Sequence, residues 1–128
     1  MALTHSLDTE HHHIHLTATG MLTLTEWQES LARAIEDPAA PPRAPILIDF
    51  AADAHPPHDW ELPLLAFLLR RIVEHRRCRL ALHSAMPEHG VSLAMLAFSC
   101  DHPHWVEVFH NLTHARAWLA QPESDATA

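Results

Sequence analysis

Apolar and polar residues alternate along positions 11–19 of the chain and then run together at 46–50. In the first segment Ile14, Leu16 and Ala18 point to one side and histidines and threonines to the other, which is the period of a half-buried strand. The second segment, ILIDF, is almost wholly apolar and follows a proline-rich loop. Such a run is typical of a strand buried on both faces of a sheet. The pattern therefore predicts one half-buried strand and one central strand.

Apolar residues at helical spacing predict two helices that flank the central strand. A capping box of Thr25 and Gln28 opens the first helix, which ends by Asp37 because a series of prolines follows. Asp59 is the expected N-cap of the second helix. Pro63 then falls inside this helix, so its first turn is expected to be irregular.

The rest of the chain contains shorter elements. Alternation predicts strands over 78–83 and 105–110, an apolar run predicts a helix over 89–99, and Asn111 is the expected N-cap of a last helix. Residues 21–24 are either a short hairpin strand or an extended lead into the first helix.

Two large apolar residues of the second helix, Leu64 and Phe67, lie outside its apolar stripe. Two explanations stay open: they cover another part of the fold, or they make a contact between two copies of the chain. A homodimer is therefore one expected state.

Strands separated by single helices imply right-handed crossovers and a mostly parallel sheet. The expected fold class is α/β, with a mixed sheet of four to five strands, strand-helix crossovers and about four helices. A chain of 128 residues, 48% apolar, suits a single domain, here placed at 11–120. Residues 1–10 have no period and are expected to be disordered or loosely attached, and the small polar residues 121–128 are expected to fray.

Charge and composition argue against some classes of function. The formal net charge is −8, and all eight basic residues are arginine, which argues against a nucleic-acid surface. Five arginines between positions 70 and 79 are expected to form the solvated end of a helix rather than a phosphate-binding patch. Two distant cysteines and no signal peptide indicate a reduced cytoplasmic protein, and the longest apolar run, 62–69, is too short to span a membrane.

Short motifs resemble one protein family. They are Gly20-Met21-Leu22-Thr23 before the first helix, Leu47-Ile48-Asp49-Phe50 in the central strand, residues 90–95, Val108-Phe109, and Ala115-Arg116-Ala117-Trp118-Leu119. In their order, and over roughly residues 11–120, they resemble the STAS superfamily, which contains the SpoIIAA-like anti-sigma-factor antagonists and is related to SEC14 domains. The resemblance implies a STAS-like fold, and none of the motifs is a catalytic signature.

The resemblance implies a regulatory protein-interaction module. In the signalling branch of the family a serine after the central strand is phosphorylated, and the added charge breaks a complex. Here no Ser, Thr or Tyr occurs from Leu31 to His83, and His58 and Asp59 stand at about the position of that serine, so the phosphorylation switch is expected to be absent. Partner sites gather at the carboxyl ends of parallel strands. The expected contact residues in the two loops there are Asp53, His55, His58, Asp59, Trp60, Met86, Glu88 and His89.

An alternative implied by the resemblance is a carrier of an apolar, lipid-like ligand. The residues that would line its pocket, or would otherwise serve as plain core, are Leu64, Phe67, Leu93, Met95, Leu96 and Phe98.

Histidine is the residue that composition singles out, with 14 in the chain. Imidazole and carboxylate groups together suit zinc, nickel or copper. One candidate set lies in the loops, at His55, His58, Asp59 and His89, and a second cluster lies on one strand face, at His11, His13 and His15. Neither matches a named zinc motif, and solvated histidines are the competing interpretation.

Catalytic chemistry has no clear support in the sequence. Cys100 beside Asp101 and His102 is only a local triplet, and two glycines cannot build a phosphate-binding loop. We therefore expect a non-enzymatic protein with no cofactor and an unidentified protein partner. A lipid carrier and a metal-binding protein are the alternatives.

Overall fold

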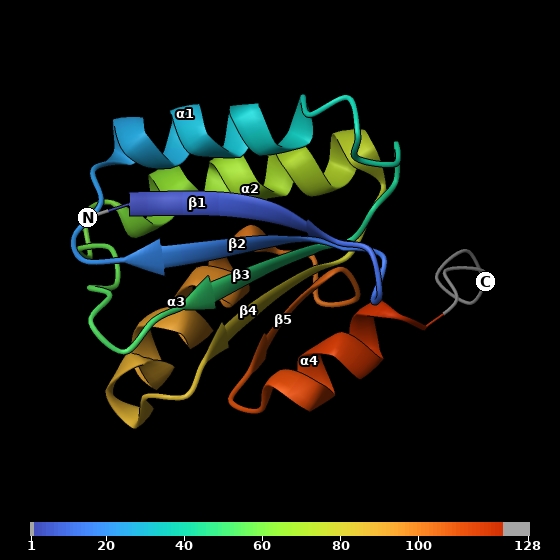
Figure 1. The fold of residues 1–128 in the computed structure, drawn as a ribbon. Coiled ribbons are helices and arrows are strands. Elements are labelled where there is room, and N and C mark those ends of the chain that lie inside the picture. The colour runs from blue at the N-terminus through green and yellow to red at the C-terminus, as the bar shows by residue number, and fades with distance from the viewer. Residues whose placement is uncertain (1, 122–128) are drawn as a thin grey trace.

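The computed structural model describes residues 2–121, which form an α/β fold around one five-stranded sheet (Figure 1). The strand order is β1-β2-β3-β4-β5, the same as the order along the chain. β1 pairs antiparallel with β2, and all other neighbours pair in parallel. The strands are β1 (Ala2–Asp8), β2 (His13–Thr19), β3 (Ile46–Phe50), β4 (Leu80–Ser84) and β5 (Val106–Phe109). The predicted fold class, with its mixed sheet and four helices, is confirmed.

The helices form two layers, one on each face of the sheet (Figure 1). The core on one face joins α1, α2 and α3 to alternate strand residues such as Ile14, Ile48 and Leu82. On the other face α4 packs its Ala115 and Leu119 against Leu47 and Ala81. The helices are α1 (Leu24–Ile35), α2 (Leu62–Arg76), α3 (Gly90–Cys100) and α4 (Leu112–Leu119), with a short 3-10 turn, η1 (Pro87–His89), before α3.

Polar side chains of β1, β2, β3 and β4 occupy part of the α4-side face of the sheet. Asp8 lies opposite His13 in the pairing of these strands, and Asp49 of β3 lies opposite His83 of β4. Because side chains of a strand alternate between faces, these residues share the face of Leu47 rather than that of Ile48. The sheet therefore separates an apolar layer under α1, α2 and α3 from a face rich in histidine and aspartate.

The N-terminal segment was expected to be loose, and that expectation is wrong for residues 2–8. They form β1, and Leu3 and Leu7 pair with Ala18 and Ile14, so both leucines pack against the main core. The polar residues between these leucines hide the alternation in the sequence. The predicted frayed tail, 121–128, lies outside the described residues apart from Gln121.

The first helix begins two residues earlier than predicted. Thr23 is its N-cap: the Thr23 hydroxyl accepts a bond from the Glu26 N–H at 3.1 Å, while a Glu26 carboxylate oxygen accepts one from the Thr23 N–H at 2.9 Å. This reciprocal pair is a capping box, formed by Thr23 and Glu26 instead of Thr25 and Gln28. Leu24 is therefore the first helical residue, and the segment before it is an extended lead rather than a hairpin strand.

The second helix begins later than predicted. Glu61, not Asp59, precedes its first residue, and the Glu61 carboxylate accepts a bond from the His58 N–H at 3.1 Å. Pro63 consequently falls in the first turn, where a missing amide donor costs no helical hydrogen bond. Asn111 caps α4 as predicted, by accepting a bond from the His114 N–H at 3.0 Å.

Two of the clustered arginines bind backbone carbonyls instead of forming a solvated helix end. Arg79 is buried, packs its guanidinium 5.3 Å from the Trp118 ring centroid and donates to the Trp118 carbonyl at 2.7 Å. Arg76 donates to the carbonyl of Ile35 at the end of α1 and to that of Pro41 in the loop that follows. For these two side chains the expected solvated role is wrong.

Cys78 and Cys100 are both buried and free. Burial raises the pKa of the Cys100 thiol to about 11, so it is not an activated nucleophile beside Asp101 and His102. None of the helices within residues 2–121 is both long and apolar enough to cross a bilayer.

Candidate functional site

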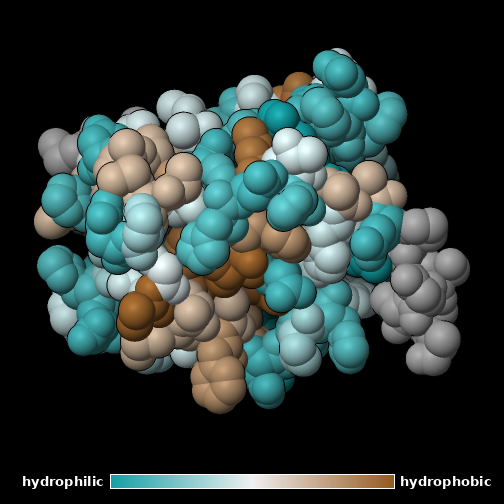
Figure 2. Space-filling model, turned by 90° about the horizontal axis from the view of Figure 1, so that it is seen from below, coloured by the Kyte–Doolittle hydropathy of each residue, from teal (hydrophilic) through white to brown (hydrophobic). Residues whose placement is uncertain are grey.

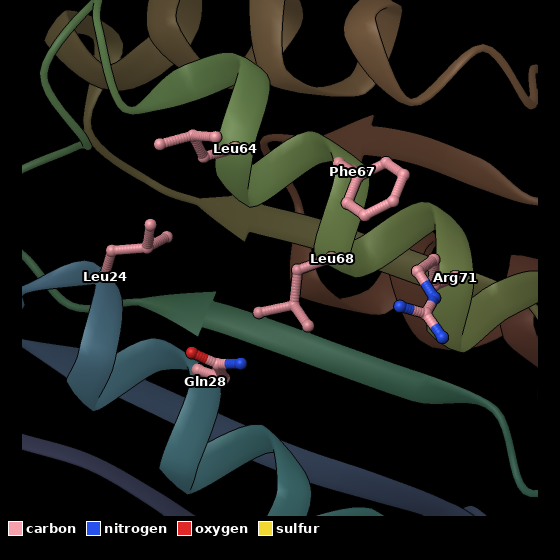
Figure 3. Close-up of a pocket in the computed structure, with 6 residues that line it drawn as sticks. All are labelled: Leu24, Gln28, Leu64, Phe67, Leu68 and Arg71. Carbon is pink, nitrogen blue, oxygen red and sulfur yellow. The ribbon is translucent and has the colours of Figure 1, made fainter.

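An apolar groove lies between α1 and α2, where the two helices run side by side over the sheet (Figure 1). Its volume is about 170 Å³. Leu24 and Leu64 stand at one end, Leu68 and Gln28 in the middle, and Arg71 at the other end (Figure 3). Phe67 completes the wall on the α2 side.

The α2 wall continues a stripe of exposed apolar residues. Trp60, Leu64 and Phe67 are 70%, 50% and 60% exposed and follow one another at helical spacing of four and three residues. Arg71 comes four residues later, with its guanidinium 5.8 Å from the Phe67 ring centroid. Exposed large apolar side chains in such an ordered row commonly mark a contact surface. The stripe joins the loop that precedes α2 to the groove.

A second exposed apolar row lies on α3. Val91, Met95 and Phe98 are 74%, 47% and 86% exposed, again at spacings of four and three residues. Figure 2 views the molecule from below, and brown and tan atoms gather in the middle and on the left, the side on which α3 lies in Figure 1. The neighbouring helices α2 and α3 thus each keep a row of apolar side chains exposed to solvent.

Most residues predicted to contact a partner lie in exposed loops that follow β3 and β4. His58 stacks on Trp60 with ring centroids 6.5 Å apart and planes 8° from parallel. His89 is different: it is 4% exposed, and its Nδ1 lies 2.7 Å from the Ser84 hydroxyl oxygen. His89 therefore supports the turn before α3 from inside and does not belong to the contact surface. The exposed members are Asp53, His55, His58, Asp59, Trp60 and Glu88, with Met86 half-buried.

The six residues predicted to line a lipid-like pocket are not brought together. Leu93 and Leu96 are fully buried core residues, whereas Met95 and Phe98 are exposed on the other side of the same helix. Leu64 and Phe67 border the groove, whose volume of about 170 Å³ is below the roughly 300–1,000 Å³ usual for small-molecule pockets. The size of the groove argues against a bulky enclosed ligand.

The loop set predicted to bind metal does not assemble either. His89 is bonded to Ser84, and among the described residues the one group of three ligand-type side chains that converges is Asp8, His13 and His15. One ligand atom from each of these three lies within 4.8 Å of the other two. The cluster predicted on one strand face is therefore close to the convergent group, with Asp8 in place of His11.

The Asp8 carboxylate connects the histidines at the end of the β1–β2 hairpin. Its Oδ2 lies 2.9 Å from Nδ1 of His11 and 3.8 Å from Nε2 of His13, and Arg116 of α4 reaches the same oxygen at 3.8 Å. A hydrogen bond from the His11 backbone N–H lowers the pKa of Asp8 to about 2. The carboxylate is consequently ionised across the physiological range.

Asp49 holds the neighbouring histidines of this face. Its two oxygens lie 2.8 Å from Nδ1 of His83 and 3.3 Å from Nε2 of His15. Burial acts to raise the pKa of Asp49, but the hydrogen bonds from His15 and His83 outweigh it and leave the pKa lowered. Since His13 and His15 have ring centroids 5.9 Å apart, the Asp8 and Asp49 groups form one continuous polar cluster.

His13 is the unusual member of this cluster. Its side chain is 1% exposed, and neither ring nitrogen has a hydrogen-bond partner among the described residues. Desolvation lowers the pKa of His13 below the ordinary value of 6.5, so the ring is held neutral. A neutral imidazole has a nitrogen lone pair that can bind a metal ion.

Sequence reasoning missed Asp8 and the groove for different reasons. Asp8 fell in a segment without visible period, because the polar His5 stands between Leu3 and Leu7 on the core side of β1. The groove pairs Leu24 and Gln28 of one helix with residues of another, and that pairing depends on the order of strands in the sheet.

The fold and its surfaces define a small α/β protein with an apolar groove between helices on one side of the sheet and a histidine-aspartate cluster on the other. No family model matches the chain, and no curated protein or solved structure matches it either.

Proposed function

We propose that this chain is a non-catalytic, STAS-like protein-interaction module that binds a partner protein in the groove between α1 and α2. The observation that carries the proposal is the apolar groove of about 170 Å³ with the exposed side chains of Leu64 and Phe67 on its wall. The succession of strands and helices supports the STAS-like part of the proposal, because it follows the order on which the resemblance rests.

The groove suits an amphipathic helix of the partner. Its volume accommodates about one large apolar side chain, its walls are mostly leucine and phenylalanine, and Arg71 at one end offers a cation to a carboxylate. A helix that binds in a groove presents apolar anchor residues on one face, three or four positions apart. Because this groove has room for about one such anchor, the proposed partner is a helix with one buried apolar anchor and an acidic residue that reaches Arg71.

The exposed loop before α2 extends this surface. Trp60 continues the row of Leu64 and Phe67, and His58 stacks against Trp60. Tryptophan and tyrosine side chains are enriched among residues that dominate binding energy at interfaces. Of the loop residues proposed from the sequence, His58 and Trp60 thus extend the proposed binding surface beyond the first turn of α2.

Substitution of Phe67 by aspartate tests the proposal. A hot-spot residue of this kind contributes about 2 kcal/mol, so Phe67→Asp should weaken partner binding by about thirtyfold. The partner is first captured from a lysate with the unaltered chain, then purified, and its dissociation constant is measured by calorimetry. Because Phe67 is 60% exposed, the free energy of unfolding should change by less than about 0.5 kcal/mol.

Phe98→Asp is the matched control, since it makes the same chemical change on the exposed row of α3. It should leave the affinity unchanged. Binding that survives Phe67→Asp, or that Phe98→Asp weakens equally, would place the contact elsewhere and remove the groove from the proposal. A dimer of the chain itself that Phe67→Asp dissociates would identify the occupant as a second copy.

A further inference from the structure

The polar face formed by β1 and β2 carries an arrangement that the groove does not use. Asp8, His13 and His15 converge there, on the sheet face opposite to α1 and α2. Each belongs to an edge or next-to-edge strand, so the backbone that positions them is fixed by the ladder of the β1–β2 pair. The sheet therefore holds the backbone of the cluster in place, and only its side chains are left to adjust.

The enclosed ring of His13 is the observation that indicates a bound ligand. Buried polar groups in proteins nearly always have a hydrogen-bond partner, and exceptions need a specific explanation such as a bound ion. Both His13 nitrogens lack a hydrogen-bond partner in the described part of the chain. Its Nε2 nevertheless faces the Asp8 carboxylate at 3.8 Å, a separation too long for a hydrogen bond. An ion between the two groups would give Nε2 of His13 the partner that it lacks.

The spacing of the ligand atoms suits one small cation after a modest adjustment. Ligands bound at about 2.0–2.2 Å in tetrahedral geometry lie about 3.4 Å from each other. The three candidate atoms lie within 4.8 Å of one another, so rotations of partly exposed side chains are enough to bring them together. Asp8 and His15 are the half-buried members that can make this adjustment.

The neighbouring groups also match those found around bound metals. Metal-bound histidines usually interact with a second carboxylate, which fixes the orientation of the ring. Asp49 lies 3.3 Å from Nε2 of His15 and is itself held by His83. Asp8 and His13 further border a hollow of about 260 Å³ at the end of the β1–β2 hairpin.

From this geometry we infer that Asp8, His13 and His15 bind one divalent transition-metal ion of the zinc class. Two imidazoles and one carboxylate are ligands that zinc accepts, and the three together leave one tetrahedral position for water. The inference is independent of partner binding in the groove, because the two sites lie on opposite faces of the sheet.

Cobalt(II) titration of chelator-treated, dialysed protein tests the site. Cobalt replaces zinc in such sites, and its visible absorption reports on the ligand geometry. We expect one equivalent to bind with the absorption of a four- or five-coordinate ion, and one equivalent of zinc to abolish that absorption. Asp8→Asn and His15→Asn should each weaken binding at least tenfold. His13 is left unaltered here because its buried ring also packs the sheet.

The control is a double variant, His55→Asn with His58→Asn, which removes two exposed histidines from the other candidate set. It should keep the full cobalt signal and stoichiometry. Circular dichroism of every variant verifies the fold. Absence of saturable binding, weak binding to several sites that survives Asp8→Asn and His15→Asn, or loss of binding in the double variant would each overturn the inference.

Discussion

At the scale of single residues, His13 is the member of the polar cluster whose burial and protonation are least favourable. Its ring is enclosed, both nitrogens lack hydrogen-bond partners among the described residues, and its charged form would lie beside Arg116 and His15. The Asp8 carboxylate opposes this effect, but desolvation is the larger influence and lowers the pKa of His13. The folded chain therefore favours a neutral His13.

This lowered pKa predicts a pH-dependent stability. Between the folded pKa and the ordinary value of 6.5, the unfolded chain binds a proton at His13 that the folded chain does not. The contribution of His13 to the unfolding free energy is thus complete above 6.5 and is lost as the pH falls. His13→Gln should reduce the decrease in unfolding free energy between pH 7.5 and pH 5, measured by urea denaturation with a chelator present.

His104→Gln serves as the control, because His104 is an exposed loop residue. This variant should show the pH dependence of the unaltered chain. An identical pH dependence in the His13 variant would mean that the buried ring does not resist protonation.

At the scale of elements, local sequence missed β1 but predicted the type of each later helix and strand better than its ends. The central strand was visible because Ile46, Leu47 and Ile48 form an apolar run, and Asn111 marked the start of the last helix. The first helix was misplaced by two residues because Thr23-x-x-Glu26 and Thr25-x-x-Gln28 fit the same capping pattern. Sequence alone could not choose between them, since the choice depends on where Leu24 must face.

The groove and the cluster differ in how far local sequence could predict them. Leu64 and Phe67 were identifiable as apolar residues outside the helical stripe, and the histidine row of β2 was identifiable from its alternation. Their partners, Gln28 and Asp8, come from separate elements. Only the strand order places those elements side by side, and no local pattern carries that information.

The capping box can be tested directly at this scale. Thr23→Ala removes the acceptor for the Glu26 N–H and should lower the free energy of unfolding by about 1 kcal/mol. Thr25→Ala is the matched control: it changes the competing threonine, which is exposed within the helix, and should alter stability by less than about 0.5 kcal/mol. Equal losses from both substitutions would contradict the observed start of α1.

At the scale of the whole molecule, exposed apolar rows on α2 and α3 coexist with a net charge of −8. Charge repulsion keeps such surfaces apart near pH 7. The 14 histidines gain protons as the pH falls, and the isoelectric point expected from the sequence is about 5.9. Near that pH the electrostatic repulsion disappears while the apolar rows remain.

We therefore predict a minimum of solubility close to pH 6, measured by light scattering across a pH series. The double variant Phe67→Asp and Phe98→Asp should scatter less at its own isoelectric point. A control with Ser99→Asp and Thr113→Asp adds the same charge at exposed polar positions and should keep the minimum, displaced to lower pH. Equal improvement in both double variants would show that charge alone, not apolar surface, governs the association.

Strand β2 has a consequence for how this chain tolerates insertion and deletion. Ile14 and Leu16 face the core under the helices, while His13 and His15 face the polar cluster. A single inserted residue between His13 and Ile14 would reverse the faces of the residues that follow, turning His15 toward the core and Ile14 and Leu16 toward the polar cluster. Two added residues would restore the alternation. Within this strand, length changes of even number should therefore be tolerated far better than odd ones, whichever amino acids are added.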